Sequence, residues 1–576
     1  MKPKHVLVLC LITLIEGVLA QIVLLSMSFD PGRGHIFNYA DLRLALAGFV
    51  ILFLTALVIS VISLLRRAKW GERLSSYLDT QLVGERKRLS FIQGALIITT
   101  VFLLECFLLT YLAFPVPMRS LFLWAAMICL QVWIMFRIAY ANDYHQRPSV
   151  AAILRGKWNE WLPIQRKVFF VVVILGLVFF LAFIPGNLFQ DAYGNFYIQG
   201  DEKVLYPDVT QVLISQDTFS GEVHTVLESW PWQYGYPYLT ASAIILIIPR
   251  LIFGNQFGEQ VQLNIFLLRQ FVSVLPMVLT LLLAVYLVTR YKSMLKSVGM
   301  FVFLSLVPGI VKYNHRFWHP DALIVLLVVL TIYFLQKDKL RFGRHFYLAA
   351  VFCGLATAIK LWGFFFGLTI AGYLLAGFLQ KKLTVKKMIL SGLLFVFAMF
   401  GTIILSSPSL MAPYIARVAL RGWLPRQSTL LYGYGPDASG YYDTGLVNWL
   451  KYFGYHYMKG YFFYFSFFAL IVGSLWGSRV YLNRILLGWC TATAFFLVYF
   501  VAMKNFQYML PVAIPLCCGA FLFPAVTADE NTLPKQLSFL TKPLAQKIIC
   551  GFTIAMFASQ LIINLVILYL FALRGR

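Results

Sequence analysis

Charged side chains are scarce in this chain of 576 residues: Asp, Glu, Lys and Arg together account for 12% of it, against 60% hydrophobic residues. A soluble domain usually carries about 25% charged residues. The apolar residues form continuous runs of membrane-spanning length, roughly 20 residues each, without the alternation that a transmembrane barrel requires. We therefore expect an all-α polytopic membrane protein rather than a soluble domain or a barrel.

Paired loop cysteines and acidic residues are also in short supply. The eight cysteines lie in apolar segments and have no metal-ligand spacing, which excludes a disulfide framework and a cysteine metal site.

The chain has 23 acids against 48 Lys and Arg. These bases cluster in short loops beside apolar runs, the positive-inside pattern, where they also meet anionic lipid. Membrane lipids are therefore expected partners, and nucleic acid is not.

The order of apolar runs and basic loops divides the chain into three parts. Residues 1–166 hold four predicted spans and form an N-terminal four-helix membrane extension. Residues 167–526 form the main membrane module, and residues 527–576 form a cytoplasmic loop and the last span. The bundle should contain about 13–15 transmembrane helices in all. Residues 238–253 are expected to lie on or dip into the outer face, because a full crossing there would place the bases after residue 289 outside.

One external loop, residues 187–237, reverses the charge of the chain: it holds seven acids and one base. Asp201 and Glu202 stand side by side within it. In an extended loop, neighbouring side chains point in opposite directions. We therefore expect one carboxylate to act on a substrate and the other to orient it, bind a metal or hold the loop. A carboxylate beside a hydrophobic wall gains the basicity that a general base needs. The alternative is that both acids only solvate the loop.

Basic and aromatic side chains gather at the predicted outer ends of the spans. Basic groups converging there would suit a phosphate or pyrophosphate carried on a lipid; the alternative is ordinary interfacial residues with snorkelling side chains. Aromatic rings after the acidic loop suit either a sugar face or an interfacial belt. The predicted lipid-phosphate residues are Arg316, His319, Lys360, Lys504, Gln507 and Tyr508, and the predicted sugar or acceptor residues are Trp230, Trp232, Tyr234 and Tyr236.

Four short motifs follow one another along the main membrane module. They are Gly200-Asp201-Glu202-Lys203; Tyr234-Gly235-Tyr236-Pro237-Tyr238-Leu239; residues 354–363; and residues 504–511. In this order they resemble motifs of the GT-C superfamily of membrane glycosyltransferases, which use lipid-phosphate-linked sugars. The group includes the protein O-mannosyltransferases and the transferase that adds aminoarabinose to lipid A.

The resemblance covers roughly residues 168–526. The second motif is similar to the family's Tyr/His-Pro-Pro-Leu element but lacks its second proline. The third is similar to Gly-Leu-Ala…Thr-Lys-Tyr-Thr-Gly. The fourth is similar to Arg-Tyr-Leu-Leu-Pro but has Gln507 where the family has Arg.

The resemblance implies a GT-C-like bundle with juxtamembrane helices in its external loop. It implies an inverting enzyme that moves a sugar from a polyprenyl-phosphate donor to a glycan, lipid or protein acceptor. The reaction would take place at the external face of a bacterial plasma membrane. It gives Asp201 the role of the catalytic, acceptor-activating carboxylate, with Glu202 supporting it. A divalent metal at these two residues is left open, because no ligand set is visible in the sequence.

Two other functions remain open at this point. A lipid-linked glycan flippase or transporter would spread charged residues through its spans and break helices near mid-membrane, often within inverted repeats. Here the charges collect at the outer span ends and no convincing internal repeat is present. A glycan polymerase or ligase would use the same outer face and the same lipid phosphate, so the sequence separates it poorly from a glycosyltransferase.

Overall fold

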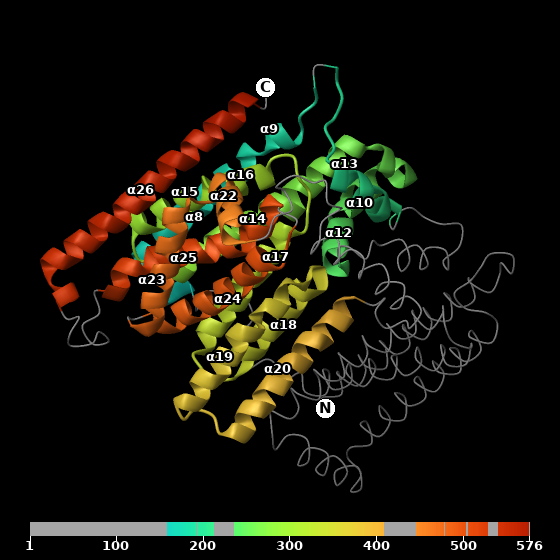
Figure 1. The fold of residues 1–576 in the computed structure, drawn as a ribbon. Coiled ribbons are helices and arrows are strands. Elements are labelled where there is room, and N and C mark those ends of the chain that lie inside the picture. Colours follow the sequence, from blue (N-terminus) through green and yellow to red (C-terminus); the bar gives the residue numbers. More distant parts are fainter. Residues whose placement is uncertain are drawn as a thin grey trace, which may run out of the picture. The chain divides into compact units, whose positions relative to one another are not determined.

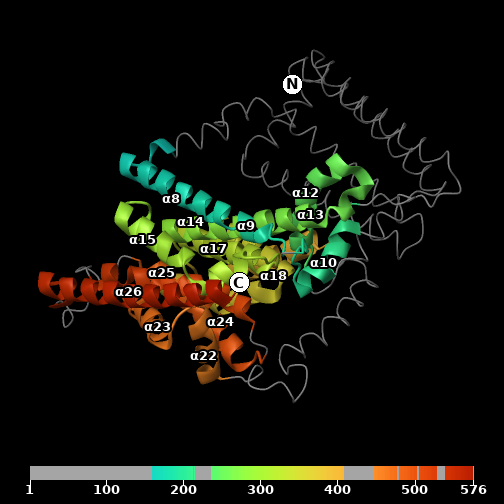
Figure 2. The same ribbon diagram turned by 90° about the horizontal axis from the view of Figure 1, so that it is seen from above.

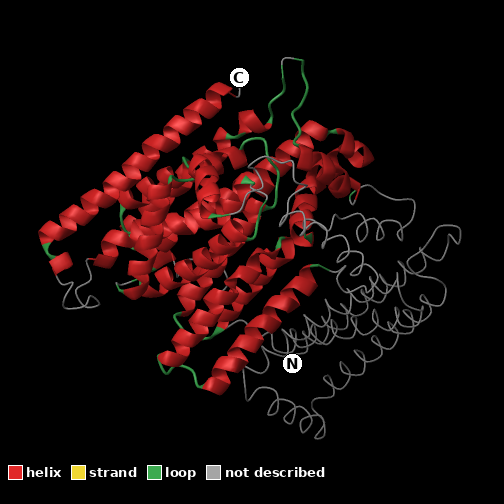
Figure 3. Ribbon diagram, viewed as in Figure 1, coloured by secondary structure: helices red, strands yellow, loops and turns green. Residues whose placement is uncertain are grey.

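The computed structural model describes residues 158–191, 193–211, 213, 235–407, 445–476, 479–502, 505–527 and 539–574. Within these ranges the regular structure is helical (Figure 3), and the one extended pairing is an isolated bridge between Gln190 and Phe196. From Trp161 onward the described residues belong to a single compact unit. The four spans predicted within residues 1–166 lie outside the described residues, as do Trp230, Trp232, Tyr234 and Lys504.

The described helices follow the chain in three groups. The first group comprises α8 (Pro163–Ala182), α9 (Ile184–Asn187), α10 (Gly200–Gln211), α12 (Tyr236–Phe253), the 3-10 segment η2 (Gly254–Glu259), α13 (Val261–Leu268), the π-helical segment η3 (Arg269–Val274) and α14 (Leu275–Thr289). The second comprises α15 (Met294–Ser305), α16 (Pro308–Asn314), α17 (Asp321–Asp338), α18 (Arg344–Ile359), η4 (Leu361–Phe365), α19 (Phe366–Leu379) and α20 (Val385–Ser406). The third comprises α22 (Leu446–His456), α23 (Gly460–Leu475), α24 (Val480–Tyr499), η6 (Phe506–Met509), α25 (Leu510–Thr527) and α26 (Pro543–Arg574).

The described part confirms an all-α, multi-pass membrane protein. It contains eight helical segments long and apolar enough to cross a membrane, or up to ten if two bent pairs each count as one span. The apolar runs of the sequence around residues 168–183, 265–289, 388–405, 485–502, 509–526 and 548–572 each coincide with one of the eight segments. Residues 238–253 lie in α12, an apolar helix of 18 residues that also meets this test. Their placement at the outer membrane surface stays a prediction.

The apolar run at residues 298–311 is not one straight helix. Its two halves, α15 and α16, are bent by 64° at the residues before Pro308. Proline has no backbone N–H, and its ring disfavours helical dihedrals in the preceding residue. Val307 is accordingly extended, with φ −70° and ψ 123°. The bend ends the long apolar run and leads the chain through α16 to the turn 315–320, which carries two of the predicted site residues, Arg316 and His319.

Helix α17 lies at the centre of the unit, packed against α14, α18, α24 and α25 (Figures 1 and 2). Its flanks are apolar and buried, which explains why most of its residues are hydrophobic. The turn before it is anchored by Trp318, a fully buried residue whose ring stacks on Tyr238 of α12 at 5.7 Å between centroids. The N-terminal end of α17 is therefore held by neighbours on several sides, and the candidate site is built around this end.

Candidate functional site

Asp201 and Glu202 lie in the first turn of helix α10, so the prediction that they sit in an extended loop is wrong. Successive residues of a helix are rotated by about 100°, and the two carboxylates still diverge. The Asp201 side chain is 50% exposed, whereas that of Glu202 is 0% exposed. Carboxylates are also favourable at this position because the first turn is the positive end of the helix dipole. The two neighbouring acids therefore occupy different environments.

The Glu202 carboxylate is an internal anchor. Its Oε1 accepts hydrogen bonds from Arg269 Nε and from the Trp318 backbone N–H, both at 2.8 Å. Its Oε2 accepts from Arg269 Nη2 at 2.6 Å and from the Gln199 backbone N–H at 2.8 Å. A bidentate arginine with two further donors satisfies a buried carboxylate. Three roles were considered for the second acid of this pair: orienting the first, binding a metal or holding the loop. The geometry fits Glu202 to the last of these.

Arg269 reaches Glu202 from the π-helical segment η3, within a long apolar stretch. Such π-helical segments occur frequently at functional sites. The same guanidinium donates to the Asn187 carbonyl at 3.3 Å, and the neighbouring Gln270 accepts from Asn187 Nδ2 at 3.0 Å. One turn on, Ser273 Oγ accepts from the His319 backbone N–H at 3.3 Å. A single segment thus fixes the end of α9, the start of α10 and the turn before α17.

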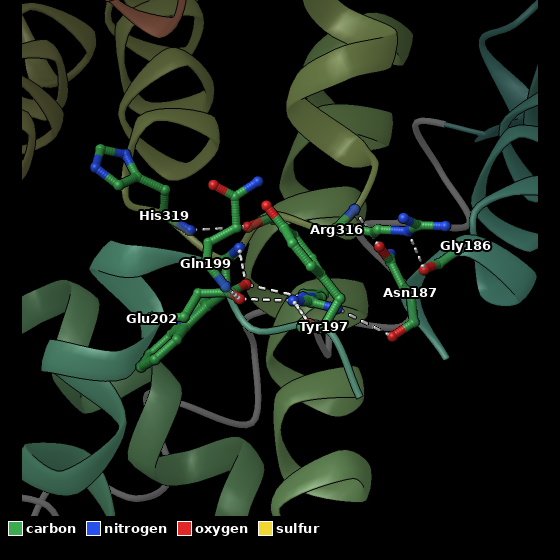
Figure 4. Close-up of polar contacts among 10 residues, drawn as sticks. Gly186, Asn187, Tyr197, Gln199, Glu202, Arg316 and His319 are labelled. Atoms are coloured by element: carbon green, nitrogen blue, oxygen red, sulfur yellow. Dashed lines mark hydrogen bonds and ion pairs between the residues drawn. The ribbon is translucent and has the colours of Figure 1, made fainter. Parts of the chain in front are cut away.

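A line of ionisable groups runs inward from Asp201. His319 Nε2 lies 3.8 Å from Asp201 Oδ2, and His319 Nδ1 contacts Asp321 Oδ2. Lys360 Nζ is 3.2 Å from both carboxylate oxygens of Asp321. Figure 4 shows that the His319 imidazole points away from the Glu202 carboxylate. Burial lowers the pKa of His319, and the opposing effect of Asp321 is smaller. The imidazole is therefore neutral near pH 7, which does not suit the phosphate-binding role predicted for it.

Arg316 differs from Lys360 in having no carboxylate partner among the described residues. Its backbone adopts the left-handed conformation, with φ 59°, which is uncommon for a residue other than glycine. Its N–H donates to Asn187 Oδ1 at 2.7 Å and its Nε to the Gly186 carbonyl at 3.3 Å, as Figure 4 shows. The guanidinium lies 3.9 Å from the centroid of the Phe189 ring. These contacts hold the Arg316 side chain in place, and no carboxylate among the described residues neutralises its charge.

The motifs around residues 235, 360 and 508 meet in space. Lys360 ends α18 in an extended conformation, with φ −156° and ψ 142°. Directly before it, the Ile359 carbonyl accepts from the Gly235 N–H at 3.0 Å. A Cβ at Gly235 would lie 1.5 Å from the Ala358 carbonyl oxygen, so only glycine fits there. On its other side, Lys360 Nζ lies 5.3 Å from the centroid of the Tyr508 ring.

The predicted residues thus fall into two groups in the described structure. Asp201, His319, Lys360 and Tyr508 form one connected set, with Arg316 held nearby through Asn187. Tyr236 and Gln507 are only 7% and 6% exposed, so neither presents its side chain broadly to solvent. Arg269 is a site residue that was not predicted from the sequence. An arginine within an otherwise apolar run was the available signal, because ionisable residues inside spans are rare and usually functional or paired.

The described residues contain no group of three or more His, Cys, Asp or Glu side chains arranged to hold a metal ion. Both Glu202 oxygens are engaged by Arg269, which leaves Asp201 and Glu202 unsuited to share a cation. No family model matches the chain, and no curated protein matches it either. Any functional conclusion therefore rests on the residues and geometry of the site.

Proposed function

We propose that the protein is an integral-membrane glycosyltransferase that moves a sugar from a polyprenyl-phosphate donor to a hydroxyl acceptor. One observation carries this proposal. A half-exposed carboxylate, Asp201, stands at the end of a buried His319–Asp321–Lys360 array, while the next residue, Glu202, locks its helix in place. A reactive group on a rigid, buried support is the arrangement that catalysis needs.

In this mechanism Asp201 is the general base. The acceptor hydroxyl gives its proton to the Asp201 carboxylate as its oxygen attacks the anomeric carbon. The bond between that carbon and the phosphate oxygen breaks, the electron pair leaves with the lipid phosphate, and the configuration inverts. Glu202 cannot share this step, because its four hydrogen bonds occupy both of its oxygens. Its part is to fix the first turn of α10, and with it the position of Asp201.

The leaving phosphate gains negative charge in the transition state, so cations positioned beside it supply the largest stabilising effect. Arg316 fits this role best, since no described carboxylate neutralises it and an aromatic ring supports its guanidinium. Lys360 shares its charge with Asp321 at 3.2 Å, which reduces what it can offer an anion. Lys504 remains a proposed phosphate ligand because it opens a motif that resembles one of the family. Tyr508, whose ring lies beside Lys360, is proposed to contact the same phosphate.

The proposed setting follows the charge pattern of the chain. The site would face the external side of a bacterial plasma membrane, opposite the basic loops. The acceptor would be a glycan, a lipid or a protein, with Trp230, Trp232 and Tyr234 binding the sugar or the acceptor. Tyr236 is only 7% exposed and is left out of this role. A GT-C-like module at residues 167–526 remains part of this proposal. It lies within a chain of about 13–15 spans that also includes the four-helix extension before it and the last span after it.

The test compares wild type with Asp201→Asn in membranes. Radiolabelled undecaprenyl-phosphate mannose, glucose and arabinose serve as donors, with the endogenous acceptors of the membrane. Loss of a general base should lower transfer by about 10²- to 10⁴-fold. Asp191→Asn is the matched control, because it makes the same chemical change at another exposed acid, one engaged only in a local turn. It should leave transfer unchanged.

Three results would contradict the proposal in different ways. Equal transfer by wild type and Asp201→Asn would show that the carboxylate is misplaced, although the enzyme class would survive. Equal losses in both variants would point to a general need for acidic charge in the loop. If wild type transfers no sugar while lipid-linked glycan still crosses the membrane, the protein is a flippase.

A further inference from the structure

Two short segments, residues 337–344 and 381–387, concentrate positive charge far from the candidate site. The first joins α17 to α18 and the second joins α19 to α20; we call them the paired loops. Asp338 is the only acid between residues 322 and 436 of the sequence. None of the bases of the paired loops has a carboxylate partner among the described residues. There are eight of them, four in each loop, and all are exposed: Lys337, Lys339, Arg341, Arg344, Lys381, Lys382, Lys386 and Lys387.

The paired loops form one surface. Lys382 Nζ of the second loop donates to the Lys339 carbonyl of the first at 3.4 Å. A Cβ at Gly377 of α19 would lie 2.4 Å from the Phe342 ring, so this ring packs directly on the backbone of α19. The helices that carry the loops also pack together, α17 on α18 and α20 on both α18 and α19 (Figure 1). The bases of the two loops therefore act together.

Asp338 fixes the shape of the first loop. Its carboxylate accepts hydrogen bonds from the backbone N–H groups of Arg341, Phe342 and Gly343 at 2.9–3.0 Å. It also accepts from the Tyr373 hydroxyl of α19 at 2.9 Å. The Asp338 residue is only 2% exposed, so its carboxylate is directed into the protein and bonds to the backbone. The one acid of this region thus organises the loop and forms no ion pair with its bases.

The backbone of the paired loops is held in an unfavourable conformation. Lys339, Leu340, Phe342 and Lys381 have φ between 52° and 58°, and they are four of the seven residues other than glycine with positive φ in the described part. Such residues persist only where the surrounding structure holds them, and they cluster at ligand-binding and switch regions. Leu340, between two of the exposed bases, is buried, and its N–H donates to the Tyr373 hydroxyl at 2.7 Å. The bases are therefore presented on a rigid frame.

The paired loops also lie at a membrane boundary. Helix α17 runs from Asp321 in the candidate site to Asp338 in the first loop and has 18 residues. At about 1.5 Å per residue its length is about 27 Å, close to the thickness of the hydrocarbon core of a bilayer, about 30 Å. The paired loops are consequently level with the lipid headgroups on the side of the membrane opposite the candidate site.

We propose that the paired loops form a preorganised binding surface for the headgroups of anionic phospholipids. A phosphate diester offers oxygens that arginine can bind with two parallel hydrogen bonds and that lysine attracts as a point charge. Clusters of four to eight bases beside a membrane span are typical of sites for anionic lipid. The sequence alone predicts a general attraction of basic loops to such lipid; the fixed backbone turns this attraction into a defined site. The proposal is independent of the glycosyltransferase function.

Native mass spectrometry of the full-length protein in detergent tests this surface, with phosphatidylglycerol or neutral phosphatidylcholine added. Wild type should bind phosphatidylglycerol more tightly. Arg341→Gln with Lys387→Gln removes one base from each loop. Each base at an anionic membrane surface contributes about 5-fold in affinity, so this variant should bind phosphatidylglycerol about 25-fold more weakly. The control, Lys292→Gln with Lys296→Gln, removes two exposed bases beside the end of α14. That end lies near the end of α17, because Tyr286 contacts Tyr333. The control should bind like wild type.

Asp338→Asn separates a built site from simple charge attraction. The amide has the size of the carboxylate but removes the one negative charge of the region and weakens the hold on three backbone N–H groups. Charge attraction alone predicts tighter binding of phosphatidylglycerol, whereas a preorganised surface predicts weaker binding. Tighter binding would overturn the proposal, as would equal losses in the two double variants or equal affinity of wild type for the two lipids. If Asp338→Asn does not fold, the comparison of the two double variants decides.

Discussion

Replacing Glu202 by Gln tests whether the buried pair with Arg269 holds the site together. The amide keeps the shape of the side chain but removes its charge, which leaves a fully buried guanidinium without a counter-ion. Its nitrogen also cannot accept the bond that Arg269 Nη2 now makes at 2.6 Å. Breaking a buried pair by removing one partner costs about 3–5 kcal/mol. We expect Tm of the detergent-purified protein to fall by about 2–4 °C, because the entropy of unfolding grows with the length of the chain and this chain has 576 residues.

Hydrogen exchange of the backbone amides should show which segments lose stability in Glu202→Gln. Glu202 joins α10 to η3 and to the turn before α17, so backbone amides of these segments should exchange faster than those of α23 and α25. Asp201→Asn is the control: that side chain is half exposed and has no buried cation, so its Tm should not change. The reasoning would be refuted by a loss below about 1 kcal/mol, or by equal effects of the two variants.

A double substitution then separates the pair from its surroundings. Arg269→Met alone leaves the Glu202 carboxylate buried without a cation, whereas Glu202→Leu together with Arg269→Met removes both charges. Apolar replacement of a buried pair is often neutral or stabilising, so the double variant should recover most of the stability lost by Arg269→Met. If the stability lost by the double variant equals the sum of the losses in Arg269→Met and Glu202→Leu measured singly, the two residues do not act as a pair.

Two further predictions concern the surroundings of the site. Gly235→Ala should prevent correct folding or displace Lys360, because the new Cβ would lie 1.5 Å from a backbone oxygen. Thermal melts of the purified variant measure this effect. Gly401→Ala is the control: nothing lies within 4 Å of its Cβ, so its Tm should be unchanged or raised. Burial raises the pKa of Asp208 to about 6 from 3.8. The folded state therefore binds more protons between these values, and stability should fall as pH rises through this window. Melting Asp208→Asn between pH 3.5 and 7 should show a smaller fall; an identical pH dependence would show that Asp208 is not responsible.

Several features of the protein followed from its sequence alone. Long apolar runs exclude a soluble fold, because a backbone that crosses lipid must satisfy its own hydrogen bonds and forms helices to do so. The positions of most described spans followed from the same physics, since hydropathy depends on local composition. The sequence also singled out Asp201, His319, Lys360 and Tyr508 as chemical candidates, because polar and charged residues are rare enough here to be noticed.

Only the tertiary structure decided which role each candidate can fill. Asp201 and Glu202 are adjacent and chemically alike in the sequence, yet one is half exposed and the other is buried. The difference comes from Arg269, 67 residues away in the sequence, whose guanidinium forms a buried ion pair with Glu202. A local pattern does not contain such a contact, because the partner lies on another helix. The same holds for His319: burial lowers its pKa and its ring contacts Asp321, so a residue predicted to bind phosphate is a neutral, buried group.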